Sequence, residues 1–431
     1  MDPRDRFLLS GVVAATATAT AWRPLDRSAA SPASLLEFLS GLPTSEMPLH
    51  ALGLQAAVGL ASARGGGARG LRGAVGLGLT AASFGGLVAL RREAGRSDEV
   101  LEAALHEGLG VDYRKRISEP FSPRPDVPLT RRSARILSGF GVRRRYAAAR
   151  DLSYGDHGRH NRLDIWRRAD LAADAGAPVL LQVHGGAWML GEKRGQAHPL
   201  MAHLAERGWV CVTINYRLSP GARWPDHIVD VKRALAWTKA NIAEHGGDPS
   251  FVVITGGSAG GHLAALAALT PGPSGRFQPG FEDAETSVVA AVPFYGVYDF
   301  TNRDGTAGRA LVPFLERQVM RSALVDDRAV WDEASPMSHV RPDAPPFFVL
   351  HGSNDVLVPV ELARSFVRRL RTASRSPVVY AELPRAQHAF DVLPSVRVHH
   401  TVRAVERFLA VVRSEHGGAT SGERRVVSDR I

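Results

Sequence analysis

A serine, an aspartate and a histidine, in that order along the chain, could together carry out nucleophilic catalysis. Ser258 is the centre of a G-x-S-x-G pattern at 256–260, between an apolar run and an Ala/Leu-rich segment. Asp355 and His388 each follow a later apolar run. A serine hydroxyl is a weak nucleophile until a histidine takes its proton, and a carboxylate holds that histidine in place. The three residues therefore predict a nucleophile, a general base and the acid that orients the base.

Two consecutive glycines after an earlier apolar run could bind the negative charge that such a reaction creates. Gly185 and Gly186 follow the run that ends at Val183. Backbone N–H groups in such a turn can face a developing oxyanion. The N–H of Ala259, at the start of the segment after Ser258, is a third candidate donor. An ordinary Gly-Gly turn is the alternative.

Two aromatic residues near these motifs are candidates for an acyl pocket. Trp188 follows the glycine pair, and Tyr216 follows the apolar run 209–214. Aromatic side chains commonly line small-molecule pockets. Packing in the core is the alternative for both residues.

The candidate residues lie at the ends of a regular alternation of apolar runs and helical patterns. Six runs have the composition of buried strands: 178–184, 209–214, 251–255, 288–294, 346–350 and 378–383. The helical patterns are 199–207, 225–244, 259–269, 360–372 and 396–412. Such alternation predicts a mostly parallel, doubly wound sheet, with its chemistry beyond the carboxyl ends of the strands. Ser258, Asp355 and His388 each follow a different strand, so we expect them at one edge.

With these motifs in place, residues 148–414 resemble the α/β-hydrolase carboxylesterases of the hormone-sensitive-lipase-like group. Within that group the chain is most similar to the mycobacterial Lip-type esterases. The matching stretches are 184–188, 215–220, 256–263, 351–359 and 387–390. The resemblance implies an α/β-hydrolase fold and a serine carboxylesterase or lipase-like hydrolase. It implies cleavage of a small-molecule or lipid ester through an acyl-enzyme on Ser258, with no metal and no organic cofactor.

Two positions depart from the pattern of that family. Ala187 stands where the third glycine of the oxyanion motif is usual, and Gly257 stands where an acid often precedes the nucleophile. The first change also resembles arylformamidases and methylesterases, so the leaving group stays open. Acyl transfer or aryl-formamide hydrolysis on the same triad are alternatives. A non-catalytic binding protein with this fold is another.

The first 118 residues differ in character from the rest. Three apolar segments are candidate membrane helices: 7–22, 47–62 and 73–90. Small residues recur four apart at Gly78, Ala82 and Gly86, a spacing found where membrane helices pack closely. Arginines flank the third segment, so we expect membrane association through this region. The cell envelope is one candidate location, the side of the membrane stays open, and a buried Gly/Ala-rich helix is the alternative.

The remaining segments predict a linker and a tail. Prolines and arginines are concentrated in 119–147, which predicts a linker between the apolar region and the hydrolase-like domain. The polar composition of 415–431 predicts a disordered tail.

Composition narrows the classes of partner. The net charge is +10, but almost all of the 53 basic residues are arginine, so we interpret the basicity as coding bias and expect no nucleic-acid partner. The one cysteine, Cys211, lies in an apolar run and predicts a buried thiol. A single cysteine excludes an intrachain disulfide and cysteine-based metal clusters. The oligomeric state stays open.

Overall fold

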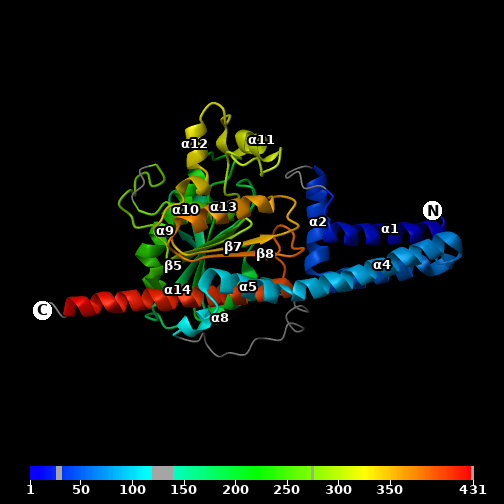
Figure 1. The fold of residues 1–431 in the computed structure, drawn as a ribbon, viewed down its shortest axis with the longest axis horizontal. Coiled ribbons are helices and arrows are strands. Elements are labelled where there is room, and N and C mark those ends of the chain that lie inside the picture. Colours follow the sequence, from blue (N-terminus) through cyan, green and yellow to red (C-terminus); the bar gives the residue numbers. More distant parts are fainter. Residues whose placement is uncertain (26–31, 119–138, 273–275, 429–431) are drawn as a thin grey trace.

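The computed structural model describes residues 1–25, 32–118, 139–272 and 276–428, and its centre is an eight-stranded sheet. The strand order is β1-β2-β4-β3-β5-β6-β7-β8 (Figure 1). β2 is antiparallel to both of its neighbours, and all other pairs are parallel. The strands are β1 (Ala147–Ser153), β2 (Arg162–Trp166), β3 (Ala177–Val183), β4 (Val210–Ile214), β5 (Gly247–Gly257), β6 (Ala290–Phe294), β7 (Phe347–Gly352) and β8 (Val378–Leu383).

Six of these strands coincide with the six apolar runs of the sequence, which confirms the predicted parallel sheet. The other two, β1 and β2, have no such run. β1 lies at the edge of the sheet and is half exposed along its length. Because an edge strand needs fewer apolar side chains than a strand covered on both faces, its sequence carries a weaker signal.

Helices cover both faces of the sheet. The larger ones are α8 (His198–Glu206), α9 (Asp226–Asn241), α10 (Ala259–Leu269), α13 (Val360–Ala373) and α14 (Val396–Ser428), and the short ones are α7 (Gly139–Tyr146), α11 (Leu311–Leu315) and α12 (Arg328–Glu333). Side chains of β3 alternate between two hydrophobic cores. Val179 and Leu181 pack with α9, α10 and α13, whereas Leu180 packs with α8 and α14. The predicted doubly wound arrangement is therefore confirmed.

Two segments were predicted to flank the hydrolase domain, a disordered tail after it and a linker before it. The tail expected to be disordered from residue 415 is helical, because α14 continues to Ser428. Most of the expected linker, 119–138, lies outside the described residues, and its last part forms α7.

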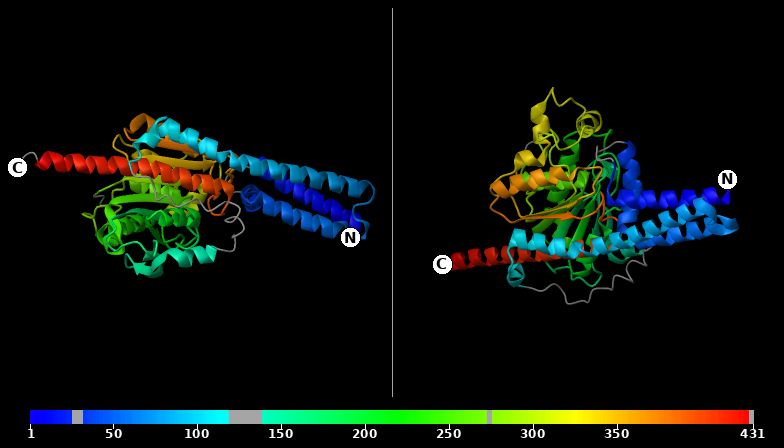
Figure 2. Two further views of the ribbon diagram at one scale, coloured as in Figure 1. Left: turned by 90° about the horizontal axis from the view of Figure 1, so that it is seen from below. Right: turned by 45° about the vertical axis from the view of Figure 1, so that its right-hand side comes forward.

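Five helices precede the hydrolase-like domain. They are α1 (Pro3–Trp22), α2 (Pro32–Glu46), α3 (Pro48–Ala63), α4 (Gly70–Gly95) and α5 (Ser97–Leu109). α1, α3 and α4 lie side by side and project from the body as a rod, which we call the projecting bundle (Figures 1 and 2). The chain begins at the far end of this bundle.

α5 belongs to the hydrolase domain rather than to the apolar region. Leu101, Leu105 and Leu109 are buried in the same core as β8 and α14. The structure therefore moves the boundary of the domain from the expected linker at 119–147 to the start of α5. The described helices before that boundary are α1 to α4.

The inside of the projecting bundle contains polar side chains that bond one another. The hydroxyl of Ser83 in α4 lies 2.8 Å from that of Thr18 in α1 and 2.7 Å from Gln55 Oε1 in α3. Trp22 Nε1 donates to the Gly86 carbonyl at 3.1 Å. Hydrogen bonds between helices are the usual way to satisfy polar side chains where no water reaches them.

Small residues let α1 and α4 approach closely, and Gly86 is the member of the predicted four-residue repeat that takes part. A Cβ added to Gly11 would lie 2.7 Å from the Gly76 carbonyl oxygen, and one added to Gly76 would lie 2.9 Å from the Phe7 ring. Gly78 and Ala82 are exposed. Of the predicted repeat of Gly78, Ala82 and Gly86, only Gly86 therefore lies at the contact with α1, where an added Cβ would be 2.6 Å from Thr18 Cγ2.

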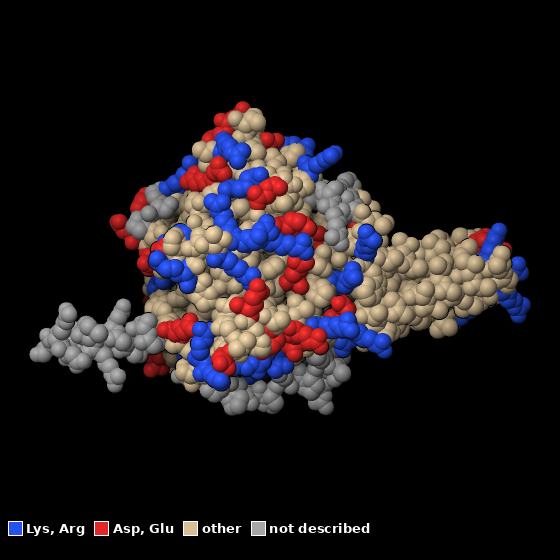
Figure 3. Space-filling model, viewed as in Figure 1, with Lys and Arg blue, Asp and Glu red and all other residues tan. Residues whose placement is uncertain are grey.

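The outside of the projecting bundle is apolar between charged ends. Large aliphatic side chains are exposed along it, namely Leu9, Val12, Val13, Leu54, Val58, Leu60, Val75, Leu77 and Val88. Figure 3 shows an uncharged band with charged residues at its tip and at its base. Among the described helices, residues 70–109 are the stretch long and apolar enough to cross a membrane, and only 28% of its most apolar window is buried.

A buried ion pair joins the N-terminal helices to the hydrolase domain. Glu46, the last residue of α2, lies 3.0 Å from Arg397 Nε in the first turn of α14, and neither side chain is exposed. Ser395 donates to the same carboxylate at 2.8 Å. Removing one member of such a pair leaves a buried charge without its counter-ion.

We expect Glu46→Gln to lower the free energy of unfolding by about 3–5 kcal/mol, because Arg397 would keep its charge in a dry site. Denaturant titration of the detergent-solubilised chain measures this. The control Asp112→Asn removes an exposed ion pair with Lys115 and should cost less than about 1 kcal/mol. Equal losses in the two variants would contradict the structural role of Glu46.

Candidate active site

Ser258 lies on a sharp turn between β5 and α10. Its backbone has φ 58° and ψ −121°, a conformation that costs a non-glycine residue free energy. The surrounding glycines make the turn possible: a Cβ on Gly260 would lie 2.1 Å from the Val183 carbonyl oxygen. Ser258 is partly exposed, unlike the buried strand before it. The turn therefore presents the hydroxyl at the carboxyl end of the sheet.

Asp355 and His388 meet at the same end of the sheet. His388 Nδ1 lies 2.7 Å from Asp355 Oδ2. The other carboxylate oxygen accepts the N–H groups of Leu357 at 2.9 Å and Val358 at 2.8 Å. Both side chains are buried. The sequence prediction that these two loops come together is consistent with this geometry.

The carboxylate of Asp355 is held in its charged form. Burial acts to raise the pKa of Asp355, but the charge of His388 and hydrogen bonds from His351 and His388 outweigh it, so the pKa lies well below its usual range. A carboxylate that stays ionised can keep the histidine ring in one orientation and stabilise its protonated form.

Tyr295, which the sequence motifs do not reveal, lies next to His388 and Gly257. Its ring centroid is 4.6 Å from that of His388. A Cβ on Gly257 would lie 2.7 Å from the Tyr295 hydroxyl. The glycine that replaces the usual acid before the nucleophile thus leaves room for Tyr295. In the described residues no hydrogen bond joins the Ser258 hydroxyl to His388.

Two further ionisable residues near Asp355 and His388 have other partners. Asp391 accepts a short hydrogen bond from the Tyr295 hydroxyl, rather than one from His388. His351 Nε2 lies 2.9 Å from the Val358 carbonyl oxygen and 3.3 Å from Asp355. His351 therefore stabilises the loop that carries Asp355.

The oxyanion candidates do not all have a free N–H. The N–H of Gly185 donates to Gln196 Oε1 at 2.7 Å, so this donor is occupied, contrary to the expectation from the glycine pair. In the described part of the chain, no hydrogen bond uses the N–H groups of Gly186, Ala187 or Ala259. Ala187 has φ 53° and lies where the family usually has glycine. These three N–H groups remain candidates for the oxyanion hole.

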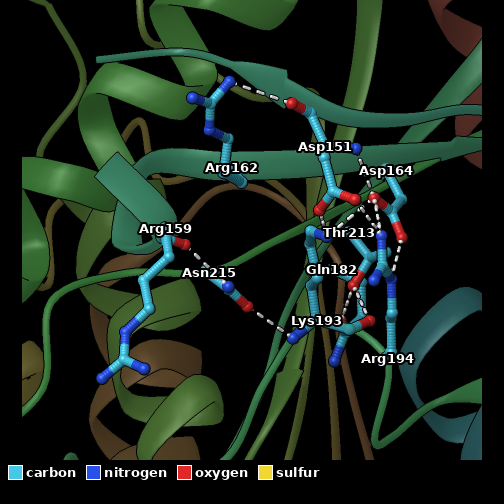
Figure 4. A network of polar contacts seen from close by, with 9 residues as sticks. All are labelled: Asp151, Arg159, Arg162, Asp164, Gln182, Lys193, Arg194, Thr213 and Asn215. Atoms are coloured by element: carbon cyan, nitrogen blue, oxygen red, sulfur yellow. Dashed lines mark hydrogen bonds and ion pairs between the residues drawn. The ribbon is translucent and has the colours of Figure 1, made fainter. Parts of the chain in front are cut away.

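A charged cluster anchors the loop that carries Gln196. Lys193 Nζ lies 2.5 Å from Asp151 Oδ1 and 2.8 Å from Asp164 Oδ1 (Figure 4). Arg194 Nε lies 2.7 Å from Asp164 Oδ2. Hydrogen bonds from Lys193 and Arg194 lower the pKa of Asp151 to about 2. Because the anchored residues lie three and two positions before Gln196, the cluster helps to fix the glycine turn.

The two aromatic pocket candidates lie in the interior. Tyr216 is fully buried and donates to the His184 carbonyl oxygen at 3.0 Å. Trp188 is buried and donates from Nε1 to His262 Nδ1 at 3.2 Å. Burial lowers the pKa of His262 to about 3, so this histidine is a neutral acceptor. Both aromatic residues pack in the core, which is the alternative that the sequence left open, and their assignment to an acyl pocket stays a prediction.

Metal-binding groups were sought in the same part of the chain. The described residues contain no cluster of three or more His, Cys, Asp or Glu side chains arranged to hold a metal ion. Cys211 is free and buried, as predicted.

Comparison with known proteins places this geometry among esterases. Residues 163–370 match the family model described as BD-FAE. The chain is 52% identical over 416 residues to a probable carboxylic ester hydrolase of Mycobacterium tuberculosis, LipM, covering 96% of this chain and 95% of the relative. It is 51% identical over 330 residues to esterase LipQ of the same organism, covering 76% and 77% of the two chains. Thermogutta terrifontis esterase 2, solved as its phosphonylation product with sarin, aligns with a TM-score of 0.52 and 25% identity, covering 61% of this chain and 94% of that one.

Proposed function

This chain belongs to the family of mycobacterial carboxylic ester hydrolases that includes LipM and LipQ, and we propose that it cleaves esters through an acyl-enzyme on Ser258. The proposal is carried by the hydrogen bond between His388 and Asp355 beside the strained turn at Ser258. The α/β-hydrolase fold that the chain shares with solved esterases supplies this arrangement at the carboxyl ends of its strands.

In the proposed reaction, His388 Nε2 takes the proton of Ser258 while the serine oxygen bonds to the ester carbonyl carbon. The carbonyl oxygen becomes an oxyanion, which the N–H groups of Gly186, Ala187 and Ala259 would bind. The intermediate collapses, the C–O bond to the alcohol breaks, and the alcohol leaves with the proton from His388. Water then attacks the acyl-enzyme with the same proton transfers and releases the acid.

The experiment that tests this function combines turnover with covalent labelling. We expect the purified full chain to hydrolyse p-nitrophenyl esters and to gain the mass of one fluorophosphonate adduct, because only an activated serine reacts with that probe. Transfer of the acyl group to an added alcohol in place of water would favour the acyltransferase alternative. Turnover of an aryl formamide alone would favour that substrate. If the chain shows neither turnover nor labelling, the binding-protein alternative is favoured.

We also propose that the projecting bundle inserts into a lipid bilayer. Polar side chains bond one another inside it, and many of its leucines and valines are exposed on the outside, unlike the pattern of a soluble bundle. The uncharged stretch of α4, residues 73–90, would be about 27 Å long as a helix, close to the hydrocarbon thickness of about 30 Å. With three helices crossing, the N-terminus and the hydrolase domain would lie on opposite sides.

Arginine substitutions on the outside of the bundle distinguish lipid from water. Leu54 and Leu77 are both exposed, so arginine would be harmless at either position in water. In a bilayer each arginine costs about 3 kcal/mol. We expect the wild-type chain to resist extraction from membranes by alkaline carbonate and the Leu54→Arg/Leu77→Arg variant to be extracted. Insertion would be contradicted if carbonate released the wild-type chain from the membranes, or if the membranes retained both the wild-type chain and the double-arginine variant.

A further inference from the structure

α2 has its apolar side exposed and its polar side buried. Leu35, Leu36 and Leu39 are 50%, 69% and 60% exposed and form what we call the α2 leucine face. Ser34 and Ser45 lie on the opposite side of the helix and are almost completely buried. A helix on the surface of a domain in water normally has the opposite arrangement.

The helix that carries the α2 leucine face lies at the base of the projecting bundle and contacts its helices. α2 runs across the direction of α1 and α4 at the base of the bundle, next to the body (Figure 1). If the bundle spans a bilayer, α2 then lies along the membrane surface, which is the usual orientation of an amphipathic helix at an interface. The arginines at that end of the bundle, Arg91 and Arg92 of α4, are the residue type that favours lipid headgroups.

The other side of the same helix touches the catalytic loops. The ring of Phe38 lies edge-on to His388, with 6.1 Å between centroids. A Cβ on Gly41 would lie 3.5 Å from Gln387 Nε2, and Gln387 Oε1 accepts the N–H of His388 at 2.9 Å. The ion pair of Glu46 with Arg397 fixes the end of the helix. α2 therefore connects the apolar exterior to the proposed general base.

The end of α1 is attached to the same loops. Asn354 Nδ2 donates to the carbonyl oxygens of Ala21 at 2.9 Å and Trp22 at 3.1 Å. Arg385 donates to the Trp22 carbonyl at 2.8 Å, and its guanidinium lies over the Trp22 ring. Asn354 directly precedes Asp355, so the loop that carries the proposed acid is held against the base of the bundle.

We propose that the α2 leucine face rests on the bilayer and that the substrates are acyl esters dissolved in that bilayer, whose chains reach Ser258 along α2 past Phe38. This inference rests on the proposed esterase function and names the class of its substrate. Bilayer lipid fits the α2 leucine face because the surface is apolar and because α2 lies at the base of the apolar bundle, at the end where α4 carries Arg91 and Arg92. An ester that reaches the site this way need not be desolvated from water.

The test compares two esters with the same leaving group. p-Nitrophenyl palmitate is dispersed in phosphatidylcholine vesicles that contain the full chain, and p-nitrophenyl acetate is supplied in water. The measured quantity is the palmitate rate divided by the acetate rate. We expect Leu35→Ser/Leu36→Ser/Leu39→Ser to lower this ratio at least about tenfold, because the interface contact depends on buried apolar area. Val111→Ser, an exposed valine after α5, is the control and should keep the wild-type ratio.

The outcomes separate this inference from the esterase proposal. An unchanged ratio in the triple-serine variant overturns the membrane route even when both esters are hydrolysed. A variant that changes from dimer to monomer in detergent with an unchanged ratio would identify the α2 leucine face as a contact between copies, which also overturns it. Absence of acetate hydrolysis by the wild-type chain would instead reject the esterase proposal.

A second variant tests the route past Phe38. We expect Phe38→Ala to change the KM for the palmitate ester more than that for the acetate ester, because only a long chain extends from the serine to α2. Equal changes in KM for the two esters would show that Phe38 merely supports His388, and would overturn this part of the route.

Discussion

Replacing Ser258 with alanine is expected to lower kcat for p-nitrophenyl butyrate by about 10⁴- to 10⁶-fold. The hydroxyl at the strained turn after β5 is the only atom that the proposed reaction joins covalently to the substrate. Initial rates of the purified full chain and its variant measure the effect. Fluorophosphonate labelling should disappear at the same time.

Ser250→Ala is the matched control for this variant. Ser250 lies near the start of the same strand, where it bonds to Asp248 and is exposed. We expect wild-type rates and labelling from it. Substantial activity in Ser258→Ala, with an unchanged circular dichroism spectrum, would show that another group is the nucleophile.

Asp355→Asn is expected to lower kcat by about 10⁴-fold with little loss of structure. The neutral amide keeps the shape of the side chain but cannot stabilise a protonated His388, and it can hold the ring in the wrong tautomer. Burial acts to raise the pKa of Asp355, but the charge of His388 and the hydrogen bonds from His351 and His388 lower it by more. The site therefore favours the carboxylate form of Asp355. Steady-state kinetics with a short-chain ester measures the loss.

Asp391→Asn provides the comparison, because Asp391 is the other buried acid beside this histidine. It accepts a hydrogen bond from the Tyr295 hydroxyl rather than from His388, and burial raises its pKa. We expect a loss of less than about tenfold, or 1.4 kcal/mol of barrier. A larger loss in Asp391→Asn than in Asp355→Asn would exchange the roles of the two acids.

The parallel sheet and the position of the proposed catalytic residues were accessible from the sequence because both depend on local patterns. A strand buried on both faces must be apolar along its length, as β3 and β4 are, and this can be read from one segment at a time. The G-x-S-x-G turn is also local, since each glycine answers a steric demand of the backbone next to it. The edge strand β1 was not predicted, because an exposed strand does not need to be apolar along its length.

Several features of the site depend on side chains that meet from distant parts of the chain. Tyr295 lies against His388, and Gln196 takes the N–H of Gly185, although no motif connects these residues. The glycine pair correctly predicted a turn but not which of its donors stays free. The burial of Trp188 and Tyr216 likewise depends on their neighbours rather than on their residue type.

The sequence by itself determined that this chain has a doubly wound domain, that Ser258, Asp355 and His388 occur in that order along it, and that apolar segments precede them. Tertiary structure alone decided which faces of those segments are exposed. Composition gives the number of apolar residues in a helix, whereas their exposure follows from the partners that the helix finds. The contact of α2 with the hydrolase domain buries Ser45 and Glu46, leaves the leucines exposed and places Phe38 against His388. This arrangement depends on the tertiary structure, because Glu46 reaches its counter-ion Arg397 only in the folded chain.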